Sequence, residues 1–246
     1  FCCTSQQTFA IKIFIFKRLL YSILHVLSTS LFDKPAYKNV VVNGIVLAED
    51  GQKMSKSKKN YPDPMLIVNK YGADALRFYL TSASVMRAED LCFSEKGVDE
   101  VYKKIVLILM NVLNFYKMYE ARIDVKVKST NVLDQWLMSK TNLLVKEVGE
   151  KMEAYELTKA ARPLMDYIDE LSTWYVRRSR DRFKDESEIS PAGATLRLAL
   201  EKLSLVLAPF MPYLSEHVWL SLGNKDSVHL QDWPEVVEAA IDRKVL

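Results

Sequence analysis

The sequence predicts a mainly α-helical protein, in which the end of an α/β unit is followed by an antiparallel bundle of helices. Two observations lead to this fold class. Before residue 90, a β-branched run from Val40 to Leu47 lies between helical segments. After residue 94, apolar residues recur three and four positions apart almost to the end of the chain. That spacing is typical of amphipathic helices that pack against one another.

The composition is that of an ordinary globular protein. The chain has 246 residues, of which 49% are hydrophobic and 26% charged. The net charge of +3 is too small to indicate nucleic-acid binding, so that function would depend on local clusters. The cysteines Cys2, Cys3 and Cys92 form no CxxC pair. Their spacing predicts no zinc site, no other metal site and no disulfide framework, and fits a reducing, cytoplasmic setting.

The first residues have an unusual pattern. The chain begins at Phe1 and not at a methionine, so we expect part of a longer protein or a shifted reading frame. The apolar run over residues 19–32 is too short to span a bilayer, and no membrane partner is expected. It predicts a buried helix whose apolar face is formed by Leu20, Ile23, Leu24, Leu27 and Leu31. A transit peptide is the alternative, because no acidic residue precedes Asp33.

The next segment is predicted to contain a short β-hairpin. Asn43-Gly44 lies between two β-branched runs, and a type I′ turn needs positive φ at both central positions. Asp50-Gly51 then ends the pairing. Asp63-Pro64 has the N-cap and first-turn proline of a new helix. From there, we expect helices over 64–71, 73–80, 94–121, 133–152, 154–183, 191–207 and 212–222, with an extended tail over 227–236.

A lysine- and serine-rich segment follows the Asp50-Gly51 turn. It reads Lys53-Met54-Ser55-Lys56-Ser57. Two ammonium groups and the hydroxyls between them can hold phosphate oxygens, and a mobile loop could follow charge as it develops on a leaving group. A helix that begins at Asp63 would add N–H donors. The alternative is a solvated basic loop or a nuclear-localisation-like patch, because Lys58 and Lys59 extend the run.

A second basic segment lies on the long helix predicted over 154–183. Its candidate RNA-binding residues are Trp174, Tyr175, Arg177, Arg178, Arg180 and Arg182. The arginines can bind phosphates while the aromatic rings stack on unpaired bases. Four-residue spacing aligns Arg178 with Arg182 and brings Asp181 within reach of Arg177. The alternative is an internal network that pairs the arginines with Asp166, Asp169, Glu170 or Glu186 and buries Trp174.

These segments together resemble class I aminoacyl-tRNA synthetases. The run from Val42 through Gln52 into Lys-Met-Ser-Lys-Ser is similar to the signature region of that class. The later run from Tyr71 to Arg77 narrows the resemblance to the isoleucyl, valyl, leucyl and methionyl group. Asn60-Tyr61-Pro62-Asp63-Pro64 and the segment 174–183 are most similar to isoleucyl-tRNA synthetase, in its C-terminal part. The valyl enzyme is the nearest alternative.

The resemblance implies a function for the two basic segments. Isoleucine would attack the α-phosphate of ATP, and the isoleucyl group would pass to tRNA(Ile). Lys56 would contact the triphosphate with help from Lys53, while Ser55 and Ser57 hold the loop, with Mg²⁺ accompanying ATP. Residues 18–90 would be the remnant of the Rossmann-type catalytic domain, 91–225 the anticodon-binding bundle and 226–246 a tail, and 1–17 match nothing expected.

The departures from the family limit what this chain could do alone. The second ATP-binding motif of the class, of the His-Ile-Gly-His type, is absent from the sequence, as is the inserted editing domain. We therefore expect the isolated chain to be inactive in adenylate formation. Two alternatives stay open: a non-catalytic RNA-binding helical module, and a helical scaffold whose arginines are paired internally.

Overall fold

The computed structural model describes residues 8–12, 15–55, 60, 62–127 and 129–242. The chain divides into two compact units. The first unit comprises residues 1–62 and 83–94, and the second comprises residues 63–82 and 95–246. The described part of the chain is mainly helical, as expected, and most of the helices belong to the second unit.

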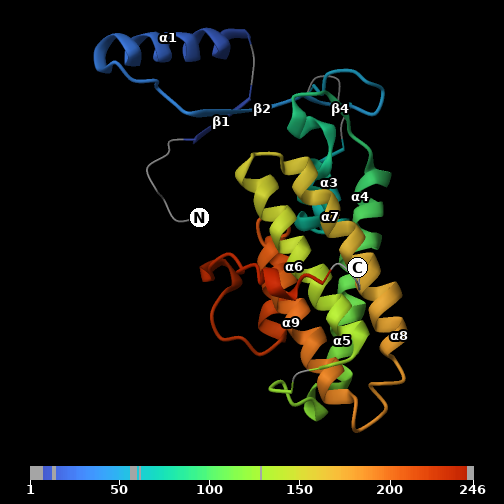
Figure 1. Ribbon diagram of the computed structural model, residues 1–246. Helices are drawn as coiled ribbons and strands as arrows, with labels where there is room; N and C mark the ends of the chain where they lie inside the picture. The colour runs from blue at the N-terminus through green and yellow to red at the C-terminus, as the bar shows by residue number, and fades with distance from the viewer. Residues whose placement is uncertain (1–7, 13–14, 56–59, 61, 128, 243–246) are drawn as a thin grey trace. The chain divides into compact units, whose positions relative to one another are not determined.

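The first unit contains a β–α–β arrangement (Figure 1). Strand β1 (Thr8–Lys12) pairs in parallel with β2 (Asn39–Asn43), and helix α1 (Ile15–Phe32) connects them. Parallel neighbours need such a crossover, because the chain must return to the same end of the sheet. Two shorter strands, β3 (Val46–Leu47) and β4 (Leu91–Cys92), form a second parallel pair.

The predicted hairpin between Val40 and Leu47 is wrong. Its two halves belong to different sheets, because β2 pairs with β1 whereas β3 pairs with β4. Gly44 also lacks the positive φ that a type I′ turn requires. Its amide donates to the carbonyl of Val85 at 2.7 Å, and a Cβ at this position would overlap the carbonyl oxygen of Glu89. The glycine is therefore needed for a close approach of two backbones.

The chain reverses direction at Asp50-Gly51, where the sequence predicted only the end of the pairing. Gly51 has a φ of +76°, and the amide of Ala48 donates to the carbonyl of Gln52 at 2.8 Å. An antiparallel bridge joins Leu47 to Lys53 across this turn. The turn therefore brings the first residue of the lysine-rich segment beside the end of β3.

The apolar face of α1 is exposed, so the prediction of a buried helix is wrong for the side chains that the structure describes. Ile23 is 46% exposed and Leu31 is 70% exposed, and Leu24 and Leu27 are also exposed. Aromatic contacts of α1 form instead through Tyr21 and His25, which both lie against Tyr37.

The second unit begins with the two short helices that the sequence predicted. Helix α2 (Pro64–Tyr71) is capped by Asp63, whose carboxylate accepts a hydrogen bond from the amide of Met65 at 2.9 Å. It ends at Gly72, which has a φ of +86°. Helix α3 (Ala73–Ser82) follows directly. The N-cap and the terminating glycine were therefore read correctly from the sequence.

The remaining helices lie alongside one another (Figure 1). Helix α6 packs against both α7 and α9, and their buried faces include Leu137, Leu164 and Leu200. The helices of this part are α4 (Glu95–Val101), a π-helical segment (Tyr102–Leu107), α5 (Ile108–Tyr119), α6 (Val132–Glu153), α7 (Leu157–Glu170), a second π-helical segment (Leu171–Val176), α8 (Arg177–Ser179), α9 (Ile189–Leu207) and α10 (Pro212–Ser221).

These bounds agree with the predicted helices, with four differences. The helix expected to continue to Phe183 ends at Ser179, so Arg180 and Arg182 lie in the turn that follows it. The helix expected from residue 154 begins at Leu157, because Tyr155 has a φ of +60° and interrupts the helical backbone. The π-helical segments widen two predicted helices internally. The tail expected to be extended contains a short 3₁₀ turn at Val228–Leu230. Among the described helices, none is both long and apolar enough to cross a membrane.

Candidate functional sites

The lysine-rich segment belongs to the first unit, and the structure describes its first half. Lys53 is exposed, whereas Met54 and Ser55 are half-buried. Lys56 and Ser57, which complete the predicted phosphate-binding set, lie outside the described residues, as do Lys58, Lys59 and Tyr61. The predicted role of Lys53 and Lys56 in ATP binding is therefore still a prediction.

The side chain of Asn60 binds the backbone of the first half of this segment. Its side-chain oxygen accepts a hydrogen bond from the amide of Ser55 at 2.9 Å, and its amide nitrogen donates to the carbonyl of Lys53 at 3.3 Å. One side chain thereby fixes the backbone of Lys53 and Ser55. The sequence analysis named Asn60 only as part of the motif that carries the family resemblance, and gave it no structural role. An asparagine just beyond a lysine- and serine-rich loop was the available signal, because asparagine often hydrogen-bonds nearby backbone.

The second candidate site is formed by the π-helical segment Leu171–Val176, by α8 and by the turn that follows them. The structure divides its six predicted RNA-binding residues into two groups. Tyr175 is fully buried, and the side chain of Arg182 is only 15% exposed. The other four are exposed: Trp174, Arg177, Arg178 and Arg180.

Tyr175 and Arg182 meet at the buried carboxylate of Asp134, which lies in the first turn of α6. Arg182 donates to both carboxylate oxygens, at 2.8 and 2.7 Å, and also pairs with Glu188 at 2.9 Å. The hydroxyl of Tyr175 donates to Asp134 at 2.7 Å, and that of Ser129 donates to it as well. Asp134 is 2% exposed, so its charge is compensated by these donors and not by solvent.

This network raises the pKa of both Arg182 and Tyr175. Hydrogen bonding to Asp134 raises the pKa of the Arg182 guanidinium. Burial, together with the neighbouring Asp134 carboxylate, raises the pKa of Tyr175 well above its usual value. Tyr175 therefore has no free face for stacking, and Arg182 has no free donor pair for a phosphate. For these two residues the structure favours the internal network over a direct contact with RNA.

The partners in that network differ from those that the sequence suggested. We expected Asp166, Asp169, Glu170 or Glu186, whereas Arg182 binds Asp134 and Glu188. Asp134 was missed because it lies 48 residues upstream, on a different helix. An acidic residue in the first turn of a helix is ordinarily explained by the helix dipole, so its sequence position gave no separate signal.

Trp174 is 44% exposed, so the alternative that buries it in the core is wrong. The guanidinium carbon of Arg178 lies 3.7 Å from the centre of a Trp174 ring, which is a close cation–π contact. Trp136 of α6 is the aromatic neighbour of Trp174, with 6.4 Å between ring centres. Trp136 was not singled out from the sequence, because it lies on another helix.

Arg177 and Arg180 add two more cations to this surface, beside Arg178. Both are exposed, and among the described residues neither forms an ion pair. The expected pairing of Asp181 with Arg177 is wrong, because Asp181 binds Lys184 at 2.9 Å. Asp181 raises the pKa of Lys184, and the nearby charge of Arg180 opposes this shift. Exposed arginines close to another cation form a small positive surface that suits phosphate groups.

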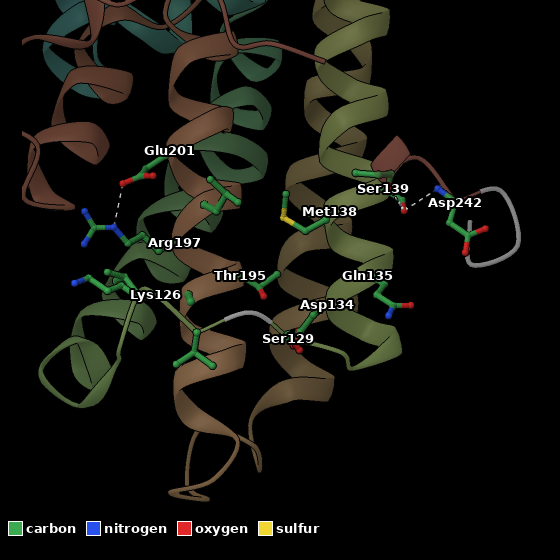
Figure 2. Close-up of a pocket in the computed structure, with 15 residues that line it drawn as sticks. Lys126, Ser129, Asp134, Gln135, Met138, Ser139, Thr195, Arg197, Glu201 and Asp242 are labelled. Carbon is green, nitrogen blue, oxygen red and sulfur yellow. Dashed lines mark hydrogen bonds and ion pairs between the residues drawn. The ribbon is translucent and has the colours of Figure 1, made fainter. Parts of the chain in front are cut away.

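A groove lies between α6 and α9, with a volume of about 920 Å³. Figure 2 shows Gln135 and Met138 of α6 and Thr195 of α9 along it, with the Arg197–Glu201 ion pair on one side. Ser139 accepts a hydrogen bond from the amide of Asp242 at its edge. None of the predicted site residues is among those that line this groove.

No group of three histidine, cysteine or acidic side chains in the described ranges is arranged to hold a metal ion. The described donors of the lysine-rich segment are an ammonium, a hydroxyl and backbone amides. These groups suit phosphate oxygens.

Two sequence families match the chain in succession. Residues 13–92 match the family described as tRNA synthetases class I (I, L, M and V), and residues 134–245 match the anticodon-binding domain of tRNA ligase. The first match contains the lysine-rich segment and the second contains the arginine-rich segment. The two matches occur in the order that the sequence analysis expected.

The curated relatives that match the chain are also tRNA ligases. The chain is 45% identical over 225 residues to an isoleucine–tRNA ligase of Chlamydia trachomatis serovar L2, and 42% identical over 239 residues to one of Treponema denticola. An isoleucine–tRNA ligase of Chlamydia muridarum is 47% identical over 226 residues. Each alignment covers 87% of this chain, which spans only 22% of the length of these relatives.

A solved structure shares the fold. It is the ternary complex of Agrobacterium radiobacter K84 agnB2 LeuRS with tRNA and LeuAMS, which matches with a TM-score of 0.68 at 22% identity. The match covers 89% of this chain and 27% of that one. The chain therefore contains a segment of the class I tRNA synthetase family (I, L, M and V) followed by the anticodon-binding domain of tRNA ligases. The curated relatives to which it is similar are isoleucine–tRNA ligases.

Proposed function

We propose that this chain supplies the ATP-binding loop and the anticodon-binding bundle of an isoleucine–tRNA ligase. The observation that carries the proposal is the succession of two family matches, with the lysine-rich segment in the first and the arginine-rich segment in the second. The complete enzyme activates isoleucine with ATP and transfers it to tRNA(Ile) in the cytoplasm. The catalytic remnant spans residues 18–90, the antiparallel anticodon-binding bundle 91–225 and the tail 226–246.

In the activation step, Lys56 and Lys53 stabilise the negative charge that develops on pyrophosphate as it leaves the α-phosphate. Ser55 and Ser57 add hydroxyl donors, Met54 spaces the two lysines, and Mg²⁺ arrives with ATP. Catalysis of this kind is positioning and electrostatics, so the geometry of the loop matters more than the basicity of either lysine. The hydrogen bonds of Asn60 to Ser55 and Lys53 support this role, because they fix the backbone from which the side chains of Lys53 and Ser55 extend.

In tRNA binding, Arg177, Arg178 and Arg180 contact phosphates and Trp174 contacts a base. Their exposure supports this assignment. Arg182 and Tyr175 do not contact tRNA in this proposal. Through Asp134 they join the arginine-rich segment to the start of α6, and so hold the exposed residues in place. The tRNA-binding surface is therefore smaller than the sequence suggested.

The test of this function is tRNA discrimination by the chain itself. We expect fluorescence anisotropy to show tighter binding to a tRNA(Ile) transcript than to the same transcript carrying the valine anticodon. Equal affinity for the two would indicate a general RNA-binding module, and the absence of binding to either would reject the tRNA function.

A second measurement concerns ATP chemistry. We expect no isoleucine-dependent pyrophosphate exchange by the chain alone, because one ATP-binding motif of the class is absent from its sequence. Exchange above background would show that the chain is a complete activating unit and would contradict the division of roles proposed here.

A further inference from the structure

Two tryptophans from different helices meet at the surface of the second unit. Trp136 extends from α6 and Trp174 from the π-helical segment, with 6.4 Å between ring centres and an interplanar angle of 51°. Trp174 is 44% exposed and Trp136 is half-buried. Tryptophan is enriched at binding interfaces, so two adjacent indole rings in contact with water are a candidate binding surface.

Each tryptophan has a cation one helical turn beyond it. Arg178 lies over Trp174, with its guanidinium carbon 3.7 Å from the ring centre. Lys140 lies over Trp136, with its ammonium nitrogen 5.8 Å from the ring centre. The four side chains therefore form a continuous row in the order Arg178, Trp174, Trp136 and Lys140, which we call the tryptophan platform.

The two cations differ in how far their charge is compensated. Lys140 binds Glu170 at 3.0 Å, whereas Arg178 forms no ion pair among the described residues. A planar guanidinium against an indole can stack on an aromatic ligand and still donate to a phosphate. The anionic part of a ligand is therefore expected at the Arg178 end of the platform.

Buried hydrogen bonds connect the two segments that carry the tryptophan platform. The buried hydrogen bond between the hydroxyl of Tyr175 and the carboxylate of Asp134 joins the same two helices, next to Trp174 in one and near Trp136 in the other. Arg182 closes that connection with two further hydrogen bonds to Asp134. Because the rings are positioned before any ligand arrives, binding loses less side-chain entropy than it would with mobile side chains.

We infer that the tryptophan platform stacks on an unpaired base of the tRNA, while Arg178 binds the adjoining phosphate. A nucleotide has the two features that this row of side chains recognises, a flat aromatic ring and a neighbouring negative charge. This inference rests on the proposed tRNA function and deepens it. It adds Trp136 and Lys140 of α6 to the RNA-binding surface, which no sequence pattern indicated.

The test uses the intrinsic fluorescence of the full chain, titrated with a tRNA(Ile) anticodon stem–loop or with a fully paired RNA duplex of the same length. We expect quenching by the stem–loop and little by the duplex, because only the former has unstacked bases. Replacement of both platform residues, Trp136→Phe with Trp174→Phe, removes the signal that reports stacking and should abolish the quenching. The matched control, Trp219→Phe with Trp233→Phe, should retain it.

Affinity gives a second readout. The pair Trp136→Leu with Trp174→Leu should weaken stem–loop binding by about five- to a hundred-fold, as expected for the loss of base stacking. Circular dichroism would establish that this variant is folded. If the wild type binds the stem–loop without quenching, or if the folded leucine variant binds as tightly as the wild type, the platform does not stack on RNA although the tRNA function stands. If the wild type binds neither tRNA(Ile) nor the stem–loop, both proposals are rejected.

Discussion

Arg182 binds Asp134 through two parallel hydrogen bonds of 2.8 and 2.7 Å, in a site where the carboxylate is 2% exposed. This pair joins the end of the arginine-rich segment to the first turn of α6. Buried ion pairs add little net stability compared with apolar packing, but the loss of one partner leaves a charge without compensation. The pair therefore matters for positioning the exposed residues around it.

Arg182→Ala should destabilise the protein strongly. We expect a loss of about 3–5 kcal/mol in the free energy of unfolding, because Asp134 would stay buried without its main donor. Arg180→Ala is the matched control, since Arg180 is exposed and forms no ion pair among the described residues, and it should change stability by less than about 0.5 kcal/mol. Urea unfolding of both variants provides the comparison, and equal midpoints would contradict the assignment of Arg182 to an internal network.

Alkaline pH should destabilise the wild type through Tyr167. Burial raises the pKa of this hydroxyl above its usual value, and the hydroxyl is paired with that of Thr141 at 2.7 Å. Above pH 10 the tyrosine ionises in the unfolded chain but not in the folded one, so the stability present below pH 10 is lost as the pH rises. The loss is about 1.4 kcal/mol per pH unit for one such group.

Tyr167→Phe removes this contribution. The free energy of unfolding of wild type and variant would be measured at several pH values between neutral and about pH 11. Above about pH 10, the wild type should lose stability relative to the variant, whereas below that pH the difference between them should be constant. A difference that does not change with pH would mean that Tyr167 ionises equally in both states.

Gly44→Ala should disrupt the first unit. The new Cβ would overlap the carbonyl oxygen of Glu89, so the backbone at residue 44 would have to move. This movement would disrupt the hydrogen bond that the Gly44 amide donates to the carbonyl of Val85. Hydrogen exchange should accelerate in residues 44–47 and 85–92. Gly51→Ala is the control: no atom lies within 4 Å of its Cβ, so only the cost of its φ of +76° applies, about 1 kcal/mol. Slower or unchanged exchange at residues 44–47 in Gly44→Ala would contradict the close-approach account.

Asn60→Ala should loosen the lysine-rich segment. The substitution removes the hydrogen bonds to Ser55 and Lys53, so trypsin should cleave within residues 53–60 faster than in the wild type. Glu49→Ala, an exposed substitution on the neighbouring turn, controls for a general change in the loop. Equal cleavage rates in the wild type and Asn60→Ala would show that Asn60 does not hold the segment.

Local signals were sufficient for much of the helical part. The periodicity of apolar residues located α6 and α9, and Asp63 with Gly72 marked both ends of α2. These features depend on residues that are close in sequence. A cap, a turn and an amphipathic face are formed within a few residues, so their sequence pattern determines them.

Contacts between distant residues were not predictable in the same way. The partner of β2 lies in residues 8–12, and the close neighbour of Gly44 is Glu89. Asn43-Gly44 has the composition of a hairpin turn, but pairing with other strands overrode that preference. The partner of Arg182 is likewise 48 residues away, so composition could not distinguish an arginine that binds RNA from one that is paired internally.

The salt dependence of tRNA binding tests the central claim most directly. The affinity of the chain for a tRNA(Ile) transcript would be measured between about 50 and 200 mM salt, because each cation that contacts a phosphate adds to the slope of log affinity against log salt. Arg177→Ala with Arg180→Ala should lower both the affinity and the slope, the latter by about one to two units. Lys103→Ala with Lys104→Ala removes the same charge from exposed residues already paired with Asp99 and Glu100, and should leave the slope unchanged. Equal slopes for the two double variants would show that the affinity for tRNA depends only on the net charge of the protein, and would contradict a binding surface at Arg177 and Arg180.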